Sequence, residues 1–203
     1  MKKEDKTKRT KERILKAAMV EFGKYGYAGA SLNNICKTGI SKGLLYHNFE
    51  NKDAVYLACV EHCFCQLKQY LAQQNIGADI RRYMNCRLQF FRKNESEARL
   101  FFEAVLQPPA RLGRQINELR KDFDALNREL YLKTLASVSL RQGVTQEDAL
   151  NYFTLMQNMF NGYFSSPVYR GMPMSEVMTA HEAGLEKLLD FMLYGIAQRR
   201  AEK

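Results

Sequence analysis

Long hydrophobic runs are absent from the 203-residue sequence. No segment approaches the roughly 18 uncharged apolar residues that a membrane-spanning helix needs, so we expect no membrane partner. The first residues, MKKEDKTKRTKER, are charged and contain no apolar segment, which argues against a secretory signal. The five cysteines are an odd number, and without an export signal we interpret them as reduced thiols of a cytoplasmic protein.

Glycine and proline are also scarce, at 12 and 4 residues, and no segment alternates apolar and polar residues for long enough to indicate a sheet. The sequence therefore predicts an all-α protein. Besides two short helices within residues 26–52, apolar side chains recur at helical spacing in seven segments: residues 10–25, 51–73, 78–93, 95–107, 113–140, 146–164 and 174–199.

Positive charge is concentrated near the N-terminus. Residues 1–52 carry 12 Lys and Arg against 5 Asp and Glu, whereas the other 151 residues carry 19 against 17. A basic module attached to a nearly neutral body indicates that the first quarter of the chain binds a polyanion. Double-stranded DNA is the leading candidate, although an anionic membrane surface would fit the charge alone.

Two short helices joined by a tight turn are predicted within residues 26–52. Ser31 is a good N-cap for the first of them, and Ser41 for the second, which should span Lys42–Phe49. Gly39 lies between them, where a helix–turn–helix needs a residue that adopts a positive φ. The segment is therefore predicted to form a helix–turn–helix.

The second short helix carries a cation, a small residue and polar aromatic side chains on its outer face. This face comprises Lys42, Gly43, Leu44, Tyr46, His47 and Asn48. Such groups suit phosphate oxygens and base edges when a helix lies in the major groove. Asn51 should cap the following long helix, and Lys52 in its first turn can bind a phosphate together with the helix N-terminus.

Residues 10–52 resemble the TetR family of transcriptional regulators. The matching segments are TKERILKAA, FGKYGY, SLNNI and TGISKGLLYHNFENK, in that order. The resemblance implies three DNA-binding N-terminal helices, a fourth linking helix and a larger helical domain that binds a small molecule and dimerises through its last two helices. It also implies DNA contacts from six residues: Ser31, Lys42, Gly43, Tyr46, His47 and Lys52.

The predicted organisation is a basic flexible tail at residues 1–9, a helix–turn–helix domain at 10–52, and a ligand-binding and dimerisation domain at 53–203. The cations of the tail either reach the DNA backbone or minor groove or form a solubilising arm. Asn34, Cys36 and Asn48 depart from the usual family pattern, so the base preference cannot be read from the sequence.

Large apolar side chains in the second domain are numerous enough to line a cavity for an apolar or aromatic effector, although a solid core needs similar residues. The candidate lining residues are Tyr83, Phe90, Phe101, Phe102, Tyr152, Met156 and Phe160. No cofactor is expected. A ligand in this cavity would displace the helix that begins at Asn51 and thereby release a pseudo-palindromic operator, as a repressor does.

The last two predicted helices carry more apolar residues than one chain needs to cover, which predicts a homodimer. The candidate interface comprises Met159, Leu185, Leu188, Leu189, Met192 and Ile196.

Other functions remain open. Cys59, His62 and Cys63 recur at i, i+3 and i+4, a spacing that would let a regulator of the same fold respond to metals or thiol oxidation. A helical small-molecule-binding protein that does not bind DNA is a further alternative. The sequence contains no GxSxG, Walker or GxGxxG motif, so we do not expect an enzyme.

Overall fold

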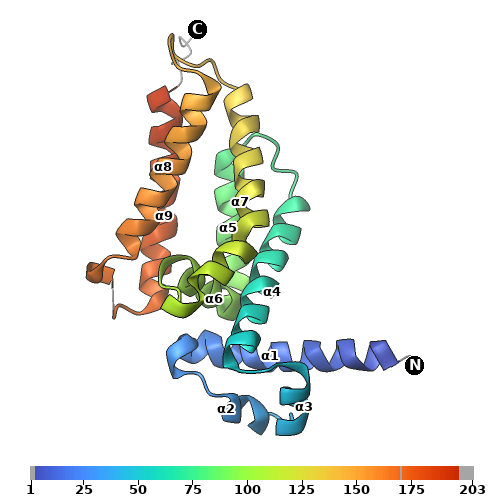
Figure 1. Ribbon diagram of the computed structural model, residues 1–203. Helices are drawn as coiled ribbons and strands as arrows, with labels where there is room; N and C mark the ends of the chain where they lie inside the picture. The colour runs from blue at the N-terminus through green and yellow to red at the C-terminus, as the bar shows by residue number, and fades with distance from the viewer. Residues whose placement is uncertain (1–2, 170, 197–203) are drawn as a thin grey trace. The chain divides into compact units, whose positions relative to one another are not determined.

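The computed structural model describes residues 3–169 and 171–196, and within these ranges it contains helices and no strand, which confirms the all-α prediction (Figure 1). The α-helices are α1 (Lys3–Gly29), α2 (Leu32–Lys37), α3 (Lys42–Asn48), α4 (Lys52–Ala72), α5 (Ile80–Lys93), α6 (Glu95–Leu106), α7 (Gly113–Ala136), α8 (Gln146–Phe164) and α9 (Met174–Ile196). Two 3₁₀ turns, η1 (Ala110–Leu112) and η2 (Pro167–Tyr169), complete the chain. None of the helices in the described ranges is long and apolar enough to cross a membrane.

The N-terminus differs from the sequence prediction. Helix α1 already begins at Lys3, so Thr10 lies inside it and residues 3–9 are helical rather than a flexible tail. Lys, Glu and Arg are good helix formers, and no glycine or proline interrupts this segment, so the helix begins before the expected start at residue 10. The cation at Lys2 lies outside the described residues.

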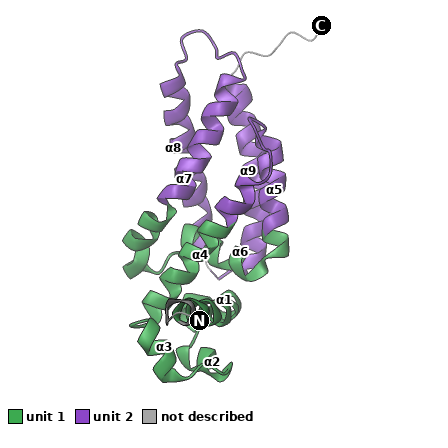
Figure 2. Cartoon of the chain, turned by 90° about the vertical axis from the view of Figure 1, so that its right-hand side faces the viewer, with its two compact units in different colours: residues 1–66, 91–120 green, residues 67–90, 121–203 purple. Residues whose placement is uncertain are grey.

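The chain forms two compact units, and their limits do not follow the predicted boundary after residue 52 (Figure 2). Unit 1 comprises the residues up to 66 together with 91–120, and unit 2 comprises 67–90 together with the residues from 121 onward. The start of α4 and the whole of α6 thus belong to the same unit as the helix–turn–helix.

In unit 1, α6 packs directly against α1 because glycine permits a close approach. A β-carbon at Gly23 would lie 2.8 Å from the Cα of Ser96, so a side chain there would push the two helices apart. The Glu103 carboxylate of α6 accepts hydrogen bonds from the Tyr27 backbone N–H at 2.8 Å and from the Tyr56 hydroxyl at 3.1 Å. These bonds tie α6 to both the end of α1 and α4.

Unit 2 contains most of α5 and α7 and the whole of α8 and α9, which run together as a bundle (Figure 2). Thr145 and Asp148 form a reciprocal capping box that sets the start of α8. Tyr131 of α7 stacks on Phe153 of α8, with ring centroids 4.0 Å apart and planes inclined by 13°. These contacts position α7 and α8 around the interior of the bundle.

Candidate functional site

Local sequence determines the geometry of the helix–turn–helix in unit 1. Ser31 caps α2 by accepting a hydrogen bond from the Asn33 N–H, and Ser41 caps α3 by accepting one from the Leu44 N–H. Gly39 has φ +89°, which side-chain-bearing residues rarely adopt. The Arg13 guanidinium donates to its carbonyl at 2.7 Å and thereby fastens the turn to α1. Figure 1 shows α2 and α3 side by side next to α1.

Helix α3 is anchored by one apolar side chain and presents its polar residues outward. Leu45 is completely buried, whereas Lys42, Gly43 and His47 are exposed and Tyr46 is 54% exposed. The two remaining predicted contacts are half-buried: Leu44, and Asn48, whose side-chain amide donates to the Leu44 carbonyl at 2.8 Å. The outer face of α3 therefore exposes the cation, the glycine and the aromatic side chains together.

The other two predicted contacts lie at helix starts. The backbone N–H of Ser31 donates to Glu21 at 2.9 Å, so this end of α2 is tied to α1. The Lys52 ammonium lies 4.8 Å from the centroid of the Tyr27 ring and donates to the Ala28 carbonyl at 3.4 Å. Lys52 is thus held against the end of α1, and it sits at the N-terminus of α4, where the helix dipole favours an anion.

The fold of unit 1 has a match among known families. Residues 14–59 match the model of the bacterial regulatory proteins of the tetR family. Over these residues the chain is similar to that family. The match covers α2, α3, most of α1 and the start of α4, which are the elements that make up the helix–turn–helix.

Relatives of the chain include two regulators. The biofilm operon icaADBC HTH-type negative transcriptional regulator IcaR of Staphylococcus epidermidis is 33% identical over 66 residues, or 32% of this chain and 36% of IcaR. The HTH-type transcriptional regulator RutR of Escherichia coli K12 is 30% identical over 121 residues, or 57% of this chain and 56% of RutR. The chain thus matches about a third to just over half the length of these relatives.

Solved structures of regulators share the fold over almost the whole chain. The fatty acid degradation regulator FadR of Bacillus halodurans has a TM-score of 0.62 at 16% identity. The alignment covers 93% of this chain and 97% of the FadR chain. FadR of Bacillus subtilis, solved in complex with stearoyl-CoA, has a TM-score of 0.61 at 14% identity, with coverage of 91% and 98%. At such low identity these similarities establish the fold alone.

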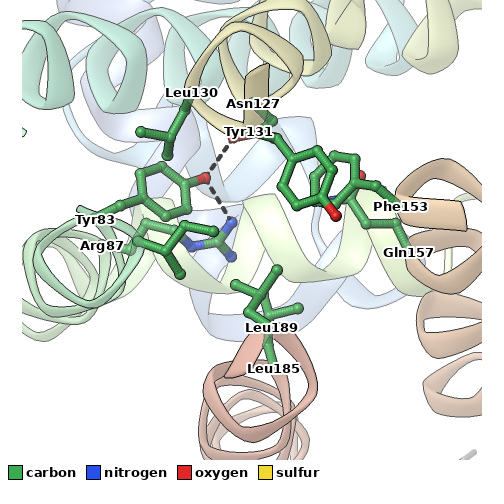
Figure 3. Close-up of a pocket in the computed structure, with 10 residues that line it drawn as sticks. Tyr83, Arg87, Asn127, Leu130, Tyr131, Phe153, Gln157, Leu185 and Leu189 are labelled. Carbon is green, nitrogen blue, oxygen red and sulfur yellow. Dashed lines mark hydrogen bonds between the residues drawn. The ribbon is translucent and has the colours of Figure 1, made fainter. Parts of the chain in front are cut away.

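Unit 2 contains a cavity with a polar side and an apolar side (Figure 3). The residues around it come from α5, α7, α8 and α9: Ile80, Tyr83, Arg87, Asn127, Leu130, Tyr131, Phe153, Gln157, Leu185 and Leu189. The space open to the centre of a water molecule is about 20 Å³, enough for a single water. A larger groove of about 340 Å³ shares Tyr83 and Leu130 with the cavity, but it includes exposed residues such as Glu129 and Lys133.

On the polar side of the cavity, the lining residue Arg87 is held in a buried ion pair with Glu182. Arg87 and Glu182 are only 5% and 6% exposed, and the guanidinium donates to both carboxylate oxygens, from Nε at 3.2 Å and from Nη2 at 2.7 Å. The Arg87 Nη1 also donates to the Tyr83 hydroxyl at 3.3 Å, and that hydroxyl donates to the Asn127 side-chain oxygen. The polar groups of this side therefore satisfy one another.

The charges of this cluster reinforce the pairing. Burial acts to raise the pKa of Glu182, but the charges and hydrogen bonds of Arg87 and His181 together hold that pKa below its usual value. Burial likewise acts to lower the pKa of Arg87, but Glu182 and Tyr83 together raise it. Burial lowers the pKa of His181, whose Nδ1 lies 3.2 Å from the Glu182 carboxylate. Arg87 and Glu182 are thus both charged at neutral pH, and His181 is neutral.

Of the seven predicted lining residues, Tyr83 is the one that borders this cavity. Phe101 and Phe102 pack in the core of unit 1, where both contact Phe91.

The other four predicted lining residues lie in unit 2. Phe90 packs against Tyr70, and Phe160 packs against Phe164 and His181. Tyr152 is exposed and Met156 is half-buried. Sequence analysis missed the lining residues Arg87, Asn127, Tyr131 and Gln157, because their grouping depends on how four helices pack.

The predicted dimer residues divide between the interior and the surface of the chain. Leu185, Leu189 and Met192 are buried in their own core and Leu188 is half-buried, so this stripe of α9 faces inward. Met159 is 59% exposed, and the side chain of Ile196 lies outside the described residues. The large exposed apolar side chains of α8 and α9 are Tyr152, Leu155, Met159, Tyr163, Phe191 and Tyr194.

The structure argues against the predicted metal or thiol site on α4. Cys59 and Cys63 are buried, and burial raises the pKa of Cys59 to about 12 and raises that of Cys63. A thiol held in its protonated form is a poor nucleophile and a poor metal ligand. No group of three or more potential metal ligands occurs in the described part of the chain.

Proposed function

We propose that the protein is a transcriptional regulator that binds a pseudo-palindromic DNA operator as a homodimer and releases it when a small molecule enters unit 2. The observation that carries the DNA-binding part is the outer face of α3, where Lys42, Gly43, Tyr46 and His47 are exposed together on a helix anchored by Leu45. The TetR-family match over residues 14–59 supports the same assignment. Acting on bacterial DNA implies a cytoplasmic location.

The proposed DNA interface uses exposed side chains for base edges and helix starts for phosphates. Tyr46, His47 and Asn48 are the candidates for base contacts, with Gly43 and Leu44 allowing close approach. Lys42 and Ser31 stand at the starts of α3 and α2, and Lys52 at the start of α4, where backbone N–H groups face outward. Two copies of α3 in a dimer would enter major grooves about 34–36 Å apart.

The proposed dimer interface is the exposed apolar face of α8 and α9. On α8 the exposed side chains Leu155, Met159 and Tyr163 recur every four residues, and on α9 Phe191 is 71% exposed. Helix faces with this much unburied apolar area are typical of protein–protein interfaces. The proposal therefore moves the α9 contribution from the buried Leu189 stripe to the opposite face.

The oligomeric state tests this part. We expect Met159→Glu combined with Phe191→Glu to sediment as a monomer, because two buried charges oppose association. Val168→Glu is the matched control: Val168 is 73% exposed on η2 rather than on α8 or α9, so this variant should remain a dimer. A dimeric double variant would contradict the proposed interface.

The ligand response is proposed to act through α4, which contributes residues to both units. RutR and FadR are named as regulators, and one FadR structure contains stearoyl-CoA, so effector binding has a precedent in this fold. For effective release the ligand must prefer the conformer that does not fit DNA. A preference of about 10⁴-fold moves the equilibrium from 1:99 to 99:1.

Selection from a random pool of double-stranded DNA tests the central proposal. At near-physiological salt we expect one pseudo-palindromic motif to be recovered with the full chain. A Tyr46→Ala variant should recover that motif poorly. Sequence-indifferent, strongly salt-dependent binding by the wild-type chain would contradict the proposal, because it would mark unit 1 as a general polyanion surface.

A further inference from the structure

One side chain of the unit 2 cavity has a hydrogen-bonding group without a partner in the described protein. Tyr131 is 1% exposed, yet its hydroxyl makes no hydrogen bond to any described residue. Its ring is held in place by the stack on Phe153. A buried hydroxyl with no partner is costly, so its persistence is best explained by a molecule that completes it.

The hydroxyl of Tyr131 belongs to the side of the cavity that holds no charge. Figure 3 shows Tyr83 and Arg87 on one side and Tyr131, Phe153 and Gln157 on the other, with Leu185 and Leu189 of α9 below them. Gln157 is half-buried and contributes an amide that can both donate and accept. The uncharged side of the cavity thus combines an aromatic wall with two neutral hydrogen-bonding groups.

The charged side of the cavity discriminates against charged ligands. Both carboxylate oxygens of Glu182 already accept from Arg87, at 2.7 and 3.2 Å, so the pair has no net charge. An incoming carboxylate would have to compete with Glu182 for Arg87 and would leave one anion buried without its partner. An incoming ammonium group would be repelled by the Arg87 guanidinium, or would compete with it for Glu182 and leave one cation buried without its partner.

We infer that this cavity binds a small uncharged molecule with one aromatic ring and one hydrogen-bonding group, which the Tyr131 hydroxyl recognises. The rings of Tyr131 and Phe153, which stack on each other, border the cavity together with the apolar residues Ile80, Leu130 and Leu189, and this lining suits an aromatic ligand. The inference rests on the proposed function, because the same cavity is the proposed effector site.

The ligand must be small, because even a single ring needs more space than the cavity offers in this conformation. The cavity accommodates about one water in this conformation, so side chains must move to admit a ligand. Leu130 and Gln157, like Ile80, are half-buried at its border, so their rotation would disturb less packing than that of the buried lining residues. The long-chain thioester in the FadR complex would need far more space than a rotation of two side chains supplies.

Three ligands of similar size but different charge show whether the cavity selects for charge or for shape. Benzamide is neutral, benzoate is its anionic counterpart, and benzylammonium is a cation of similar bulk. In titration calorimetry of the full chain we expect benzamide to bind at millimolar or lower concentration. Benzoate and benzylammonium should bind at least about tenfold more weakly, because each leaves a buried charge unpaired.

Tyr131→Phe is the variant that decides the role of the hydroxyl. It keeps the stack on Phe153, and its ligand-free melting temperature should be no lower than that of the wild type, since an unpartnered buried group is lost. Its affinity for benzamide should fall about tenfold, the size of one lost hydrogen bond. Tyr152→Phe, at an exposed position of α8, is the matched control and should bind benzamide normally.

The outcomes separate this inference from the proposed function. No benzamide binding, equal binding of benzoate, or an unchanged affinity in Tyr131→Phe would each overturn the inference. DNA selection by the ligand-free chain is the independent measurement. If a DNA motif is recovered while benzamide fails to bind, the ligand inference alone is wrong. If benzamide binds but no motif is recovered, the proposed DNA-binding function fails instead.

Discussion

The outer face of α3 and the cavity of unit 2 both gather polar side chains, but they use them in opposite ways. On α3, Tyr46 and Lys42 face solvent, so water satisfies them until another partner replaces it. In the cavity, Arg87 and Glu182 are almost completely buried and must satisfy each other. Exposed polar groups can therefore be replaced at little cost in stability, whereas removing one partner of a buried pair leaves the other unsatisfied and destabilises the unit.

The largest effect on stability is expected when one member of the buried ion pair beside the cavity is replaced. Arg87→Met leaves the Glu182 carboxylate buried without its cation, and the free energy of unfolding should fall by about 3–5 kcal/mol. Urea denaturation measures this. Arg87→Met combined with Glu182→Leu removes both charges and should recover most of the loss. A single variant as stable as the double variant would contradict the pairing.

A smaller effect is expected at the exposed surface, and it should appear in binding rather than in folding. Tyr46→Ala should weaken binding to the selected DNA motif by about 1–3 kcal/mol, the range for one base contact, with an unchanged melting temperature. Fluorescence anisotropy measures the affinity. Tyr25→Ala is the control, because Tyr25 is similarly exposed at 48% but lies on α1, outside the proposed contacts. Equal losses in the two variants would remove Tyr46 from the interface.

The cap of α3 links folding and binding. Ser41→Ala removes the oxygen that accepts from the Leu44 N–H at 3.2 Å, and this change should cost about 1 kcal/mol of stability. DNA affinity should fall as well, because α3 frays. Ser41→Asn keeps a capping oxygen and should restore most of both losses. A Ser41→Ala variant with wild-type stability and affinity would show that the turn and Leu45 hold α3 without the cap.

A phosphate contact leaves a distinct signature in the salt dependence. Lys42→Ala should weaken binding to all DNA sequences alike and reduce the slope of log affinity against log salt by about 1. Lys93→Ala, at the exposed C-terminal end of α5, should leave the slope unchanged. If Lys42→Ala changes the preferred sequence but not the slope, Lys42 reads a base rather than a phosphate.

The smallest expected effect is a pH dependence centred on the buried cluster. Burial lowers the pKa of His181, so the unfolded chain takes up the proton first as the pH falls through about 6.5. The stability that neutral His181 contributes is complete above this pH and decreases below it. Chemical denaturation at pH 7 and pH 5.5 should detect the decrease. His181→Gln should flatten this dependence, and an equally steep profile in that variant would place its origin elsewhere.

The helix–turn–helix could be predicted from the sequence because its determinants are local. Gly39 supplies the positive φ, Ser41 supplies the cap, and both act on residues within one turn. The α6–α1 contact could not be predicted in this way. It joins Gly23 to Ser96 and Glu103 to Tyr27, pairs separated by more than 70 residues in the sequence.

The stripe on α9 shows a different limit. Its apolar spacing correctly indicates an amphipathic helix, but the pattern does not say what covers the apolar face. Leu185, Leu189 and Met192 are covered by their own chain, and the exposed Phe191 lies on the other face. The pairing of Arg87 with Glu182 spans 95 residues, so no local pattern marks either residue as part of a cavity.

The most direct test of the central claim is the ratio of two dissociation constants, measured with the full wild-type chain at near-physiological salt. One duplex carries the selected motif and the other carries the same bases in scrambled order. The proposed recognition by α3 predicts at least about 10³-fold tighter binding to the selected duplex. A ratio near one would contradict it and reduce unit 1 to a basic surface without sequence preference.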